Sequence, residues 1–349
     1  MKVSIVGAGG EVGRMLAIHL LRAGLLRRGD VLQLVGHGEV STARKLLAMR
    51  IDLLDGFDEV QPEIEVVSSL DAIEGDIIVM TAGSTISPDY PTRRDLAAAN
   101  KPLFEDFATA VATHGSGREI IVVVSNPVEL AVDVVARRID RHRVLGMGAQ
   151  QDSLRFARAL ADDLGVHRTR VHAWVLGEHG DGMVPIWSGV QLLGADPKES
   201  SKRVLKLRDG TQLKHFDARI QAARSAVMTL MNEGDIEASY QAVHQLSPDL
   251  RILIEPFITH HCLNATANAT ANATCDLVQA LTTGRDSIVA AQVKLAGETH
   301  GLNTVCGMPV IVNAGGWSNV ACPDLAEEEK IRLLQSCENI ASNLELWNR

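Results

Sequence analysis

The chain opens with MKVSIVGAGGEVG (residues 1–13), in which a short run of Val and Ile leads directly into glycines. A buried strand followed by a glycine turn and a helix is the context of a dinucleotide-binding loop. Glycines let the backbone approach a pyrophosphate, and the helix N-terminus offers free N–H groups to it. Gly7, Gly10 and Gly13 have the spacing G-x-x-G-x-x-G, not the strict G-x-G-x-x-G. We predict that these three glycines bind a cofactor; a glycine turn without a ligand is the alternative.

Outward from this stretch, apolar runs alternate with segments of helical periodicity through the first half of the chain. Strands rich in Val and Ile without polar alternation are typical of a parallel sheet covered on both faces. The alternation therefore predicts an α/β domain with a doubly wound parallel sheet. We expect strands at Val3–Val6, Val31–Val35, Ile64–Val67, Asp76–Met80 and Ile120–Val124, and helices at Glu11–Ala23, Thr42–Asp55, Arg94–His114 and Val128–Arg138.

The second half of the chain is less regular and predicts an α+β arrangement. The prediction divides the chain into a dinucleotide-binding domain (residues 1–148) and a substrate domain (residues 149–349). No Pro- or Ser-rich linker separates them, so we expect them to pack together. Helices are expected at Asp152–Leu164, Ala218–Met231, Cys275–Thr282 and Glu327–Asn343, a strand at Val171–Leu176, and antiparallel strands at Ser287–Leu295 and Met308–Val312.

The composition excludes several classes of protein. The chain has 349 residues and a net charge of -9, which disfavours nucleic-acid binding. No apolar stretch approaches the length of about 18 residues that a membrane span needs, and the N-terminus does not look like a signal peptide. Five cysteines without C-x-x-C spacing argue against a disulfide framework or a zinc site. We expect reduced thiols, no metal and a cytoplasmic location.

A repeat of period four, NATANATANAT, covers residues 264–274 and contains three Asn-Ala-Thr sequons. Glycosylation would need a secretory route, which nothing in the sequence indicates. On a helix, Asn264, Asn268 and Asn272 would form one stripe and the threonines another. Two interpretations stay open: a helix of small residues packed against a neighbour, or a pocket wall that offers polar groups to a substrate.

The end of the second predicted strand bears on the choice of cofactor. NAD-binding chains usually carry an acidic residue about 20 residues after the glycines, where it binds the adenosine ribose. Gly36 stands at this place, so no carboxylate would repel a 2′-phosphate. His37, Ser41, Thr42, Arg44 and Lys45 follow and could bind that phosphate. We predict NADP or dual use; a loop that tolerates glycine and still takes NAD is the alternative.

Four further motifs lie at the predicted ends of strands, helices and loops. They are TRRDL (residues 92–96), SNPV (125–128), QDSLRF (151–156) and LGEHGD (176–181). With the glycine loop, they resemble the L-lactate/malate dehydrogenase family, in order, from about residue 1 to about residue 345. The resemblance implies an N-terminal Rossmann domain and hydride transfer between NAD(P) and an L-2-hydroxy acid. It also implies a homodimer or homotetramer.

The residue types suit that chemistry by themselves. Oxidation of a secondary alcohol needs a base for the hydroxyl proton, and the imidazole of His179 titrates near physiological pH. Asp152 can accept the other imidazole N–H and favour the protonated ring. Arg155, three residues further along a helix, has a planar fork suited to a substrate carboxylate. Taken singly, His179 could be a turn residue, and Asp152 with Arg155 a surface salt bridge.

The resemblance assigns further roles to residues that match its motifs. Arg93 matches the mobile-loop arginine that polarises the reacting carbonyl. Asn126 matches the asparagine near the reacting oxygen and the nicotinamide, and Asn100 matches a further active-site asparagine. Thr266 falls near a position that lines the substrate pocket.

The predicted pocket departs from both branches of the family. Malate dehydrogenases carry an arginine soon after the Ala-Gly of the loop and lactate dehydrogenases a glutamine, whereas this chain has Ile86, or Ser87 with a shifted gap. Neither neutralises a second carboxylate, so malate is disfavoured unless Arg94 substitutes. Asn268 stands where relatives place bulky aromatic residues. We therefore expect a wider, more polar pocket for a 2-oxo acid with a neutral polar or longer tail.

Other functions remain as alternatives. An ordinary NAD-dependent malate or lactate dehydrogenase is the nearest of them. An NAD-dependent glycosidase would share the sheet but needs a metal held by Cys and His. A cofactor-binding sensor without activity is the third, and the motifs around His179, Asp152, Arg155 and Arg93 argue against it.

Overall fold

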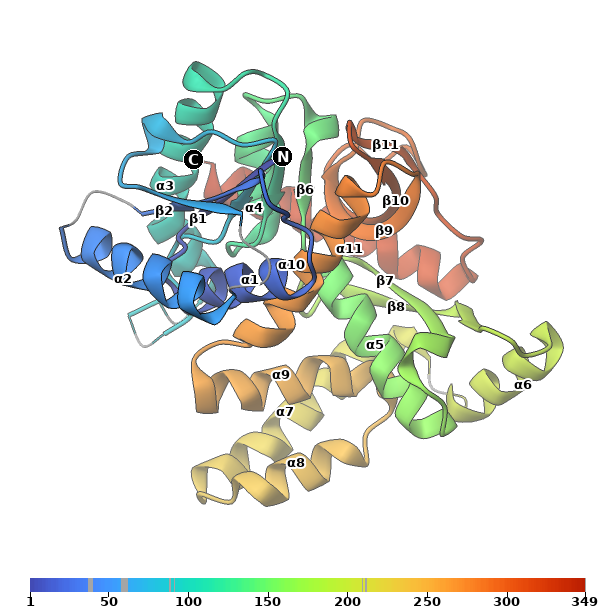
Figure 1. Cartoon of the computed structure of the whole chain (residues 1–349). Coiled ribbons are helices and arrows are strands. Elements are labelled where there is room, and N and C mark those ends of the chain that lie inside the picture. The colour runs from blue at the N-terminus through green and yellow to red at the C-terminus, as the bar shows by residue number, and fades with distance from the viewer. Residues whose placement is uncertain are drawn as a thin grey trace.

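The computed structural model describes residues 1–36, 40–57, 62–87, 89–90, 92–208, 210 and 212–348. Helices and strands alternate through the first half of the chain (Figure 1). The strands are β1 (Lys2–Val6), β2 (Val31–Val35), β3 (Glu63–Val67), β4 (Ile77–Met80), β5 (Ile120–Val123), β6 (Val144–Gly146), β7 (Val171–Gly177), β8 (Met183–Leu192), β9 (Ser287–Lys294), β10 (Val305–Asn313) and β11 (Gly316–Val320). The α-helices are α1 (Glu11–Arg22), α2 (Val40–Gly56), α3 (Arg93–His114), α4 (Val128–Ala136), α5 (Gly148–Leu164), α6 (Pro197–Arg208), α7 (Phe216–Asn232), α8 (Ile236–His244), α9 (Pro248–Leu263), α10 (Ala267–Thr282) and α11 (Glu327–Trp347).

One sheet runs through the described part of the molecule. Its first six strands are parallel in the order β3-β2-β1-β4-β5-β6, which confirms the predicted doubly wound sheet. At Gly146, β6 pairs with Gln292 of β9, and from there the antiparallel strands β9, β10, β7 and β8 continue the sheet. The parallel and antiparallel halves are thus joined edge to edge in one sheet.

Successive residues of the parallel strands contribute to cores on opposite faces of the sheet. Ile77 and Val79 of β4 belong to one core, with α1 and α2, which extends to α5 and α10. Ile78 and Met80 belong to the other, with α3, α4 and the end of α11. Burial on both faces explains why β4 (IIVM) and β5 (IIVV) are apolar throughout.

Most of the predicted elements are found, and all the unpredicted ones except β6 lie in the second half. Strands β6, β8 and β11 and helices α6, α8 and α9 were not predicted. Helix α9 is buried through much of its length and contains Pro256, so it shows neither a clear polar face nor a helix-favouring composition. In Figure 1, α7, α8 and α9 form a layer of their own below α5.

The helix expected at Cys275–Thr282 begins earlier, at Ala267, and includes most of the Asn-Ala-Thr repeat. The proposed stripe of three asparagines is wrong at its first member. Asn264 ends α9 with a left-handed backbone (φ 59°), and Thr266 precedes the first turn of α10. Asn268 is exposed and its Oδ1 atom lies 2.9 Å from His19 Nε2 on α1.

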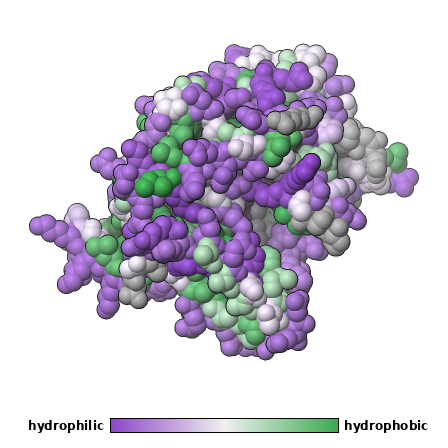
Figure 2. All heavy atoms as spheres, turned by 180° about the vertical axis from the view of Figure 1, so that it is seen from behind, coloured by the Kyte–Doolittle hydropathy of each residue, from purple (hydrophilic) through white to green (hydrophobic). Residues whose placement is uncertain are grey.

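All five cysteines are free. None of the helices in the described ranges is long and apolar enough to cross a membrane. The face shown in Figure 2 is mostly hydrophilic, with hydrophobic side chains in small scattered groups.

Candidate active site

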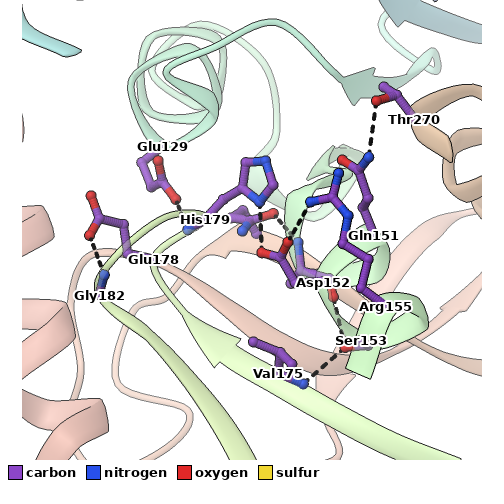
Figure 3. Close-up of polar contacts among 12 residues, drawn as sticks. Glu129, Gln151, Asp152, Ser153, Arg155, Val175, Glu178, His179, Gly182 and Thr270 are labelled. Atoms are coloured by element: carbon purple, nitrogen blue, oxygen red, sulfur yellow. Dashed lines mark hydrogen bonds and ion pairs between the residues drawn. The ribbon is translucent and has the colours of Figure 1, made fainter. Parts of the chain in front are cut away.

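Helix α5 and the loop after β7 bring two candidate catalytic side chains into contact. The Nδ1 atom of His179 lies 2.7 Å from Oδ2 of Asp152, and the Asp152 side chain is 1% exposed (Figure 3). Within the described part of the chain, the other ring nitrogen, Nε2, has no hydrogen-bond partner. The pair leaves one imidazole nitrogen fixed and the other available to a ligand.

Two glycines make room for the imidazole of His179. A Cβ atom on Gly148, in the first turn of α5, would collide with the ring. Gly177, the last residue of β7, has a φ of 81°, which lets the chain turn out of the sheet just before the histidine. Gly177 belongs to the LGEHGD motif, whereas Gly148 lies outside the predicted motifs.

Arg155 lies one turn beyond Asp152 on α5, and its guanidinium points to the same place. Its Nη1 atom lies 3.3 Å from Asp152 Oδ1, and its Nη2 atom lies 3.2 Å from the hydroxyl of Thr266. The Arg155 side chain is 15% exposed, so this is not an ordinary surface salt bridge. Burial lowers the pKa of Arg155, and the charge of Asp152 opposes that shift. A buried guanidinium with donors to spare suits a carboxylate ligand.

Arg93 is the first residue of α3 and contacts the same loop from the other side. Its Nη2 atom donates to the backbone carbonyl of His179 at 2.9 Å and lies 3.3 Å from Glu129 Oε2, while Nη1 contacts Glu178. Burial opposes its charge, but the attraction of Glu178 and Glu129 outweighs burial and raises the pKa of Arg93. The guanidinium is therefore held beside the histidine as a permanent cation.

Two acids at this point were not predicted. Glu129 accepts a hydrogen bond from the backbone N–H of His179 at 2.7 Å, and Glu178 accepts one from the N–H of Gly182 at 3.1 Å. Both are close in sequence to motifs that were recognised, Glu178 inside LGEHGD and Glu129 just after SNPV. Only their proximity to a motif could have indicated a place in the site. A carboxylate at the start of a helix is common and does not by itself indicate a functional residue.

The two asparagines lie close together but differ in exposure. Asn100 is 2% exposed and its amide is engaged with backbone groups. Its Nδ2 atom donates to the carbonyls of Ser84 and Asn126, at 3.0 and 2.7 Å, and its Oδ1 atom accepts from Ser84 N–H. Asn100 therefore joins two loops through these contacts, and its role beside the cofactor stays a prediction. Asn126 is exposed at the end of β5, and Ile86 is 45% exposed on the loop before α3.

The glycine loop has the shape that a bound dinucleotide requires. A Cβ atom on Gly7 would lie 2.7 Å from the backbone of Ala82, and one on Gly13 would lie 2.5 Å from the carbonyl oxygen of Gly7. Gly10 precedes α1 without a side-chain cap, so backbone N–H groups remain to bind an anion. The side chain of Lys45 on α2 runs past Gly9, its Cδ atom 3.7 Å from where a Cβ would lie. The residues present therefore fit a dinucleotide.

Gly36 follows β2 beside this loop, and a side chain there would require the neighbouring side chains to shift. A Cβ atom there would lie 2.7 Å from Thr42 Cγ2 and 2.8 Å from Leu46 Cδ1. Ser41 is in the first turn of α2. His37, another predicted cofactor residue, lies outside the described residues.

Comparison with known families finds two matches along the chain. A model of the lactate/malate dehydrogenase NAD-binding domain matches residues 1–146, and a model of the lactate/malate dehydrogenase alpha/beta C-terminal domain matches residues 150–244.

Individual relatives agree with these matches. The L-lactate dehydrogenase B chain of Sceloporus undulatus is 37% identical over 203 residues, which is 57% of either chain. The match thus spans less than two thirds of that relative. The L-2-hydroxycarboxylate dehydrogenase (NAD(P)(+)) of Methanocaldococcus jannaschii is 25% identical over 97% of both chains.

Solved structures resemble the fold over nearly the whole chain. Malate dehydrogenase from Plasmodium falciparum superposes with a TM-score of 0.76 at 20% identity, covering 99% of this chain and 98% of its own. A lactate dehydrogenase from Cryptosporidium parvum, complexed with lactic acid and nicotinamide adenine dinucleotide, gives 0.77 at 19% identity, covering 100% of this chain and 98% of its own. At these identities the likeness concerns the fold alone.

Proposed function

The chain belongs to the lactate/malate dehydrogenase family, and we propose that it interconverts an L-2-hydroxy acid and its 2-oxo acid with a nicotinamide cofactor. The observation that carries this proposal is the 2.7 Å contact between His179 Nδ1 and Asp152 Oδ2, with the Arg155 guanidinium one helical turn away. These three groups supply a proton acceptor, its orienting carboxylate and an anion clamp in one place.

In the proposed mechanism, the substrate carboxylate pairs with Arg155, which places C2 near the free Nε2 of His179. On oxidation, Nε2 takes the hydroxyl proton while the hydrogen of C2 leaves as a hydride; on reduction, the protonated ring returns that proton to the carbonyl oxygen. Asp152 keeps Nδ1 protonated and stabilises the imidazolium. We assign to Arg93, a permanent cation beside the loop, the role of polarising the substrate carbonyl. Asn126 would contact the reacting oxygen and the nicotinamide.

The cofactor supplies or accepts the hydride when bound. Gly7, Gly10 and Gly13 would hold its pyrophosphate on the N-terminus of α1, where the structure provides uncapped N–H groups. We assign NADP or dual use, which is supported by Gly36, because no carboxylate stands where it would repel a 2′-phosphate. Ser41 and the cations of α2 would contact the 2′-phosphate.

The remaining assignments are part of the same proposal. The division into domains lies between residues 148 and 149, and the protein is placed in the cytoplasm as a homodimer or homotetramer. Ile86 and Thr266 are assigned to the pocket wall; of these, Thr266 already contacts Arg155. An ordinary malate dehydrogenase remains the second candidate, and Arg94, which is exposed on α3, would have to bind its second carboxylate.

Initial rates of NADH and NADPH oxidation across a panel of 2-oxo acids test the proposal. The panel includes pyruvate, oxaloacetate, and branched, hydroxylated and sulfonated acids. We expect turnover of a non-dicarboxylic acid with NADPH, and loss of turnover with retained cofactor binding in His179→Asn. Preference for NADH and oxaloacetate would identify an ordinary malate dehydrogenase. Absence of turnover for every acid would contradict the proposed activity.

A further inference from the structure

A buried polar cluster adjoins the Arg155 guanidinium. The amide nitrogen of Gln151 lies 3.1 Å from the hydroxyl of Thr270 and 3.3 Å from that of Thr266. The Thr266 hydroxyl, in turn, lies 3.2 Å from Arg155 Nη2. Gln151 is 4% exposed and directly precedes Asp152 on α5. In Figure 3, the side chains of Gln151 and Arg155 run side by side, and Gln151 points to Thr270.

The hydrogen bonds in this cluster leave groups available for a ligand. Gln151 donates to both hydroxyl oxygens, and Arg155 also donates to Thr266. The two hydroxyl oxygens are 3.4 Å apart, so one hydroxyl can donate its hydrogen to the other. The hydrogen of the second hydroxyl is not needed for this contact. Among the described residues, neither the remaining hydroxyl hydrogen nor the Gln151 carbonyl oxygen has a partner. The cluster therefore offers one donor and one acceptor.

We propose that Gln151 and Thr270 form a neutral polar subsite that selects 2-oxo acids carrying a hydroxyl group on C3. A hydroxyl both donates and accepts, so it satisfies the two free groups at once. The subsite rests on the proposed function, because its place is defined by a substrate whose C1 carboxylate is held by Arg155. Gln151 is then a specificity-determining residue.

Other C3 substituents fit this wall less well. A methyl group would leave the amide carbonyl and the hydroxyl hydrogen without partners, which is unfavourable in a buried place. A carboxylate could accept a hydrogen bond from a hydroxyl, but it would also face the Gln151 carbonyl oxygen and the negative charge of Asp152. The subsite supplies amide and hydroxyl groups and no cation to neutralise that carboxylate. The neutral hydroxyl is the substituent that the two free groups complement.

Pyruvate and hydroxypyruvate differ only by this hydroxyl and form a matched pair of substrates. We expect the intact enzyme to show a kcat/KM for hydroxypyruvate at least about tenfold above that for pyruvate. Gln151→Leu and Thr270→Val should each reduce this ratio to within about threefold of one. Thr274→Val is the matched control. It removes a hydroxyl from the same face of α10, but that hydroxyl donates to the backbone carbonyl of Thr270, so the ratio should not change.

The ratio separates a role in specificity from a merely structural one. If Gln151 only supported the fold or Arg155, both substrates would lose kcat/KM equally and the ratio would stay. An unchanged ratio in Gln151→Leu and Thr270→Val, or no preference in the intact enzyme, would overturn the subsite while leaving the proposed function in place. If no 2-oxo acid is reduced at all, the proposed function itself fails, and the subsite with it.

Discussion

His179 Nδ1 lies 2.7 Å from Asp152 Oδ2 although 27 positions separate the two residues and each belongs to a different element. Helix α5 packs against β7, and this contact brings the first turns of the helix to the loop that follows the strand. One ring nitrogen of the histidine is thereby fixed, which the proposed reaction requires.

Asp152→Asn should lower kcat by about 10²- to 10⁴-fold and should affect KM less. The amide can donate to Nδ1 and so favour the tautomer that places a hydrogen on Nε2, where the base is needed. Steady-state kinetics checks this, with Asp162→Asn as a control in the same helix, since Asp162 is 52% exposed. A kcat within about tenfold of the wild type would contradict the role assigned to Asp152.

Arg155→Lys should raise the KM for the 2-oxo acid by about 10- to 100-fold. Lysine keeps the charge but not the fork that can hold a carboxylate with two hydrogen bonds. Arg158→Lys is the matched control, because Arg158 is on the same helix and 44% exposed. Equal KM values for the two variants would mean that Arg155 does not hold the substrate.

Glu129→Gln should change how stability depends on pH. Burial raises the pKa of Glu129, Arg93 opposes the shift, and Glu178 adds to it. A carboxyl whose pKa is raised in the folded protein contributes its full stability at pH values below its pKa in the unfolded chain, about 4.3. This contribution is lost as the pH rises through the pKa of the folded state. The free energy of unfolding of the wild type, relative to the variant, should therefore fall between acid and neutral pH.

Glu119→Gln provides the opposite case for the same denaturation measurement. Burial works against the charge of Glu119, but backbone N–H donors, including that of Ser116, outweigh it and lower its pKa. Its contribution is present above the unfolded pKa and is lost as pH falls through the folded pKa. Parallel trends for the two variants would show that the Glu129 carboxyl is not destabilised by burial.

Gly36→Asp should shift cofactor preference toward NAD, because a carboxylate there repels a 2′-phosphate. Thr42 crowds the position, so the substitution belongs in a Thr42→Ala background, with Thr42→Ala alone as the control. We expect the ratio of kcat/KM for NADPH over NADH to fall at least about tenfold. The same ratio in both variants would rule out a determining role for Gly36.

Most of the parallel half of the fold was predictable because its elements have a local signal, although the three-residue strand β6 was missed. Continuous apolar runs such as Ile77–Met80 mark strands that are buried on both faces, and glycines at Gly7 and Gly13 mark a turn. The antiparallel half was less predictable. Helix α9 is buried among other helices, so the periodic pattern that marks a surface helix is weak.

By itself, the sequence determined the doubly wound α/β class, the family resemblance and the residue types of the proposed catalytic group, because strand periodicity and motif spacing are local properties of the chain. Only the tertiary structure decided which side chains meet. It placed Glu129 and Glu178 around Arg93, assigned Asn100 to backbone contacts and turned Gln151 toward Thr270. Such contacts join residues that are far apart in sequence. They depend on how helices pack against the sheet, which no local pattern records.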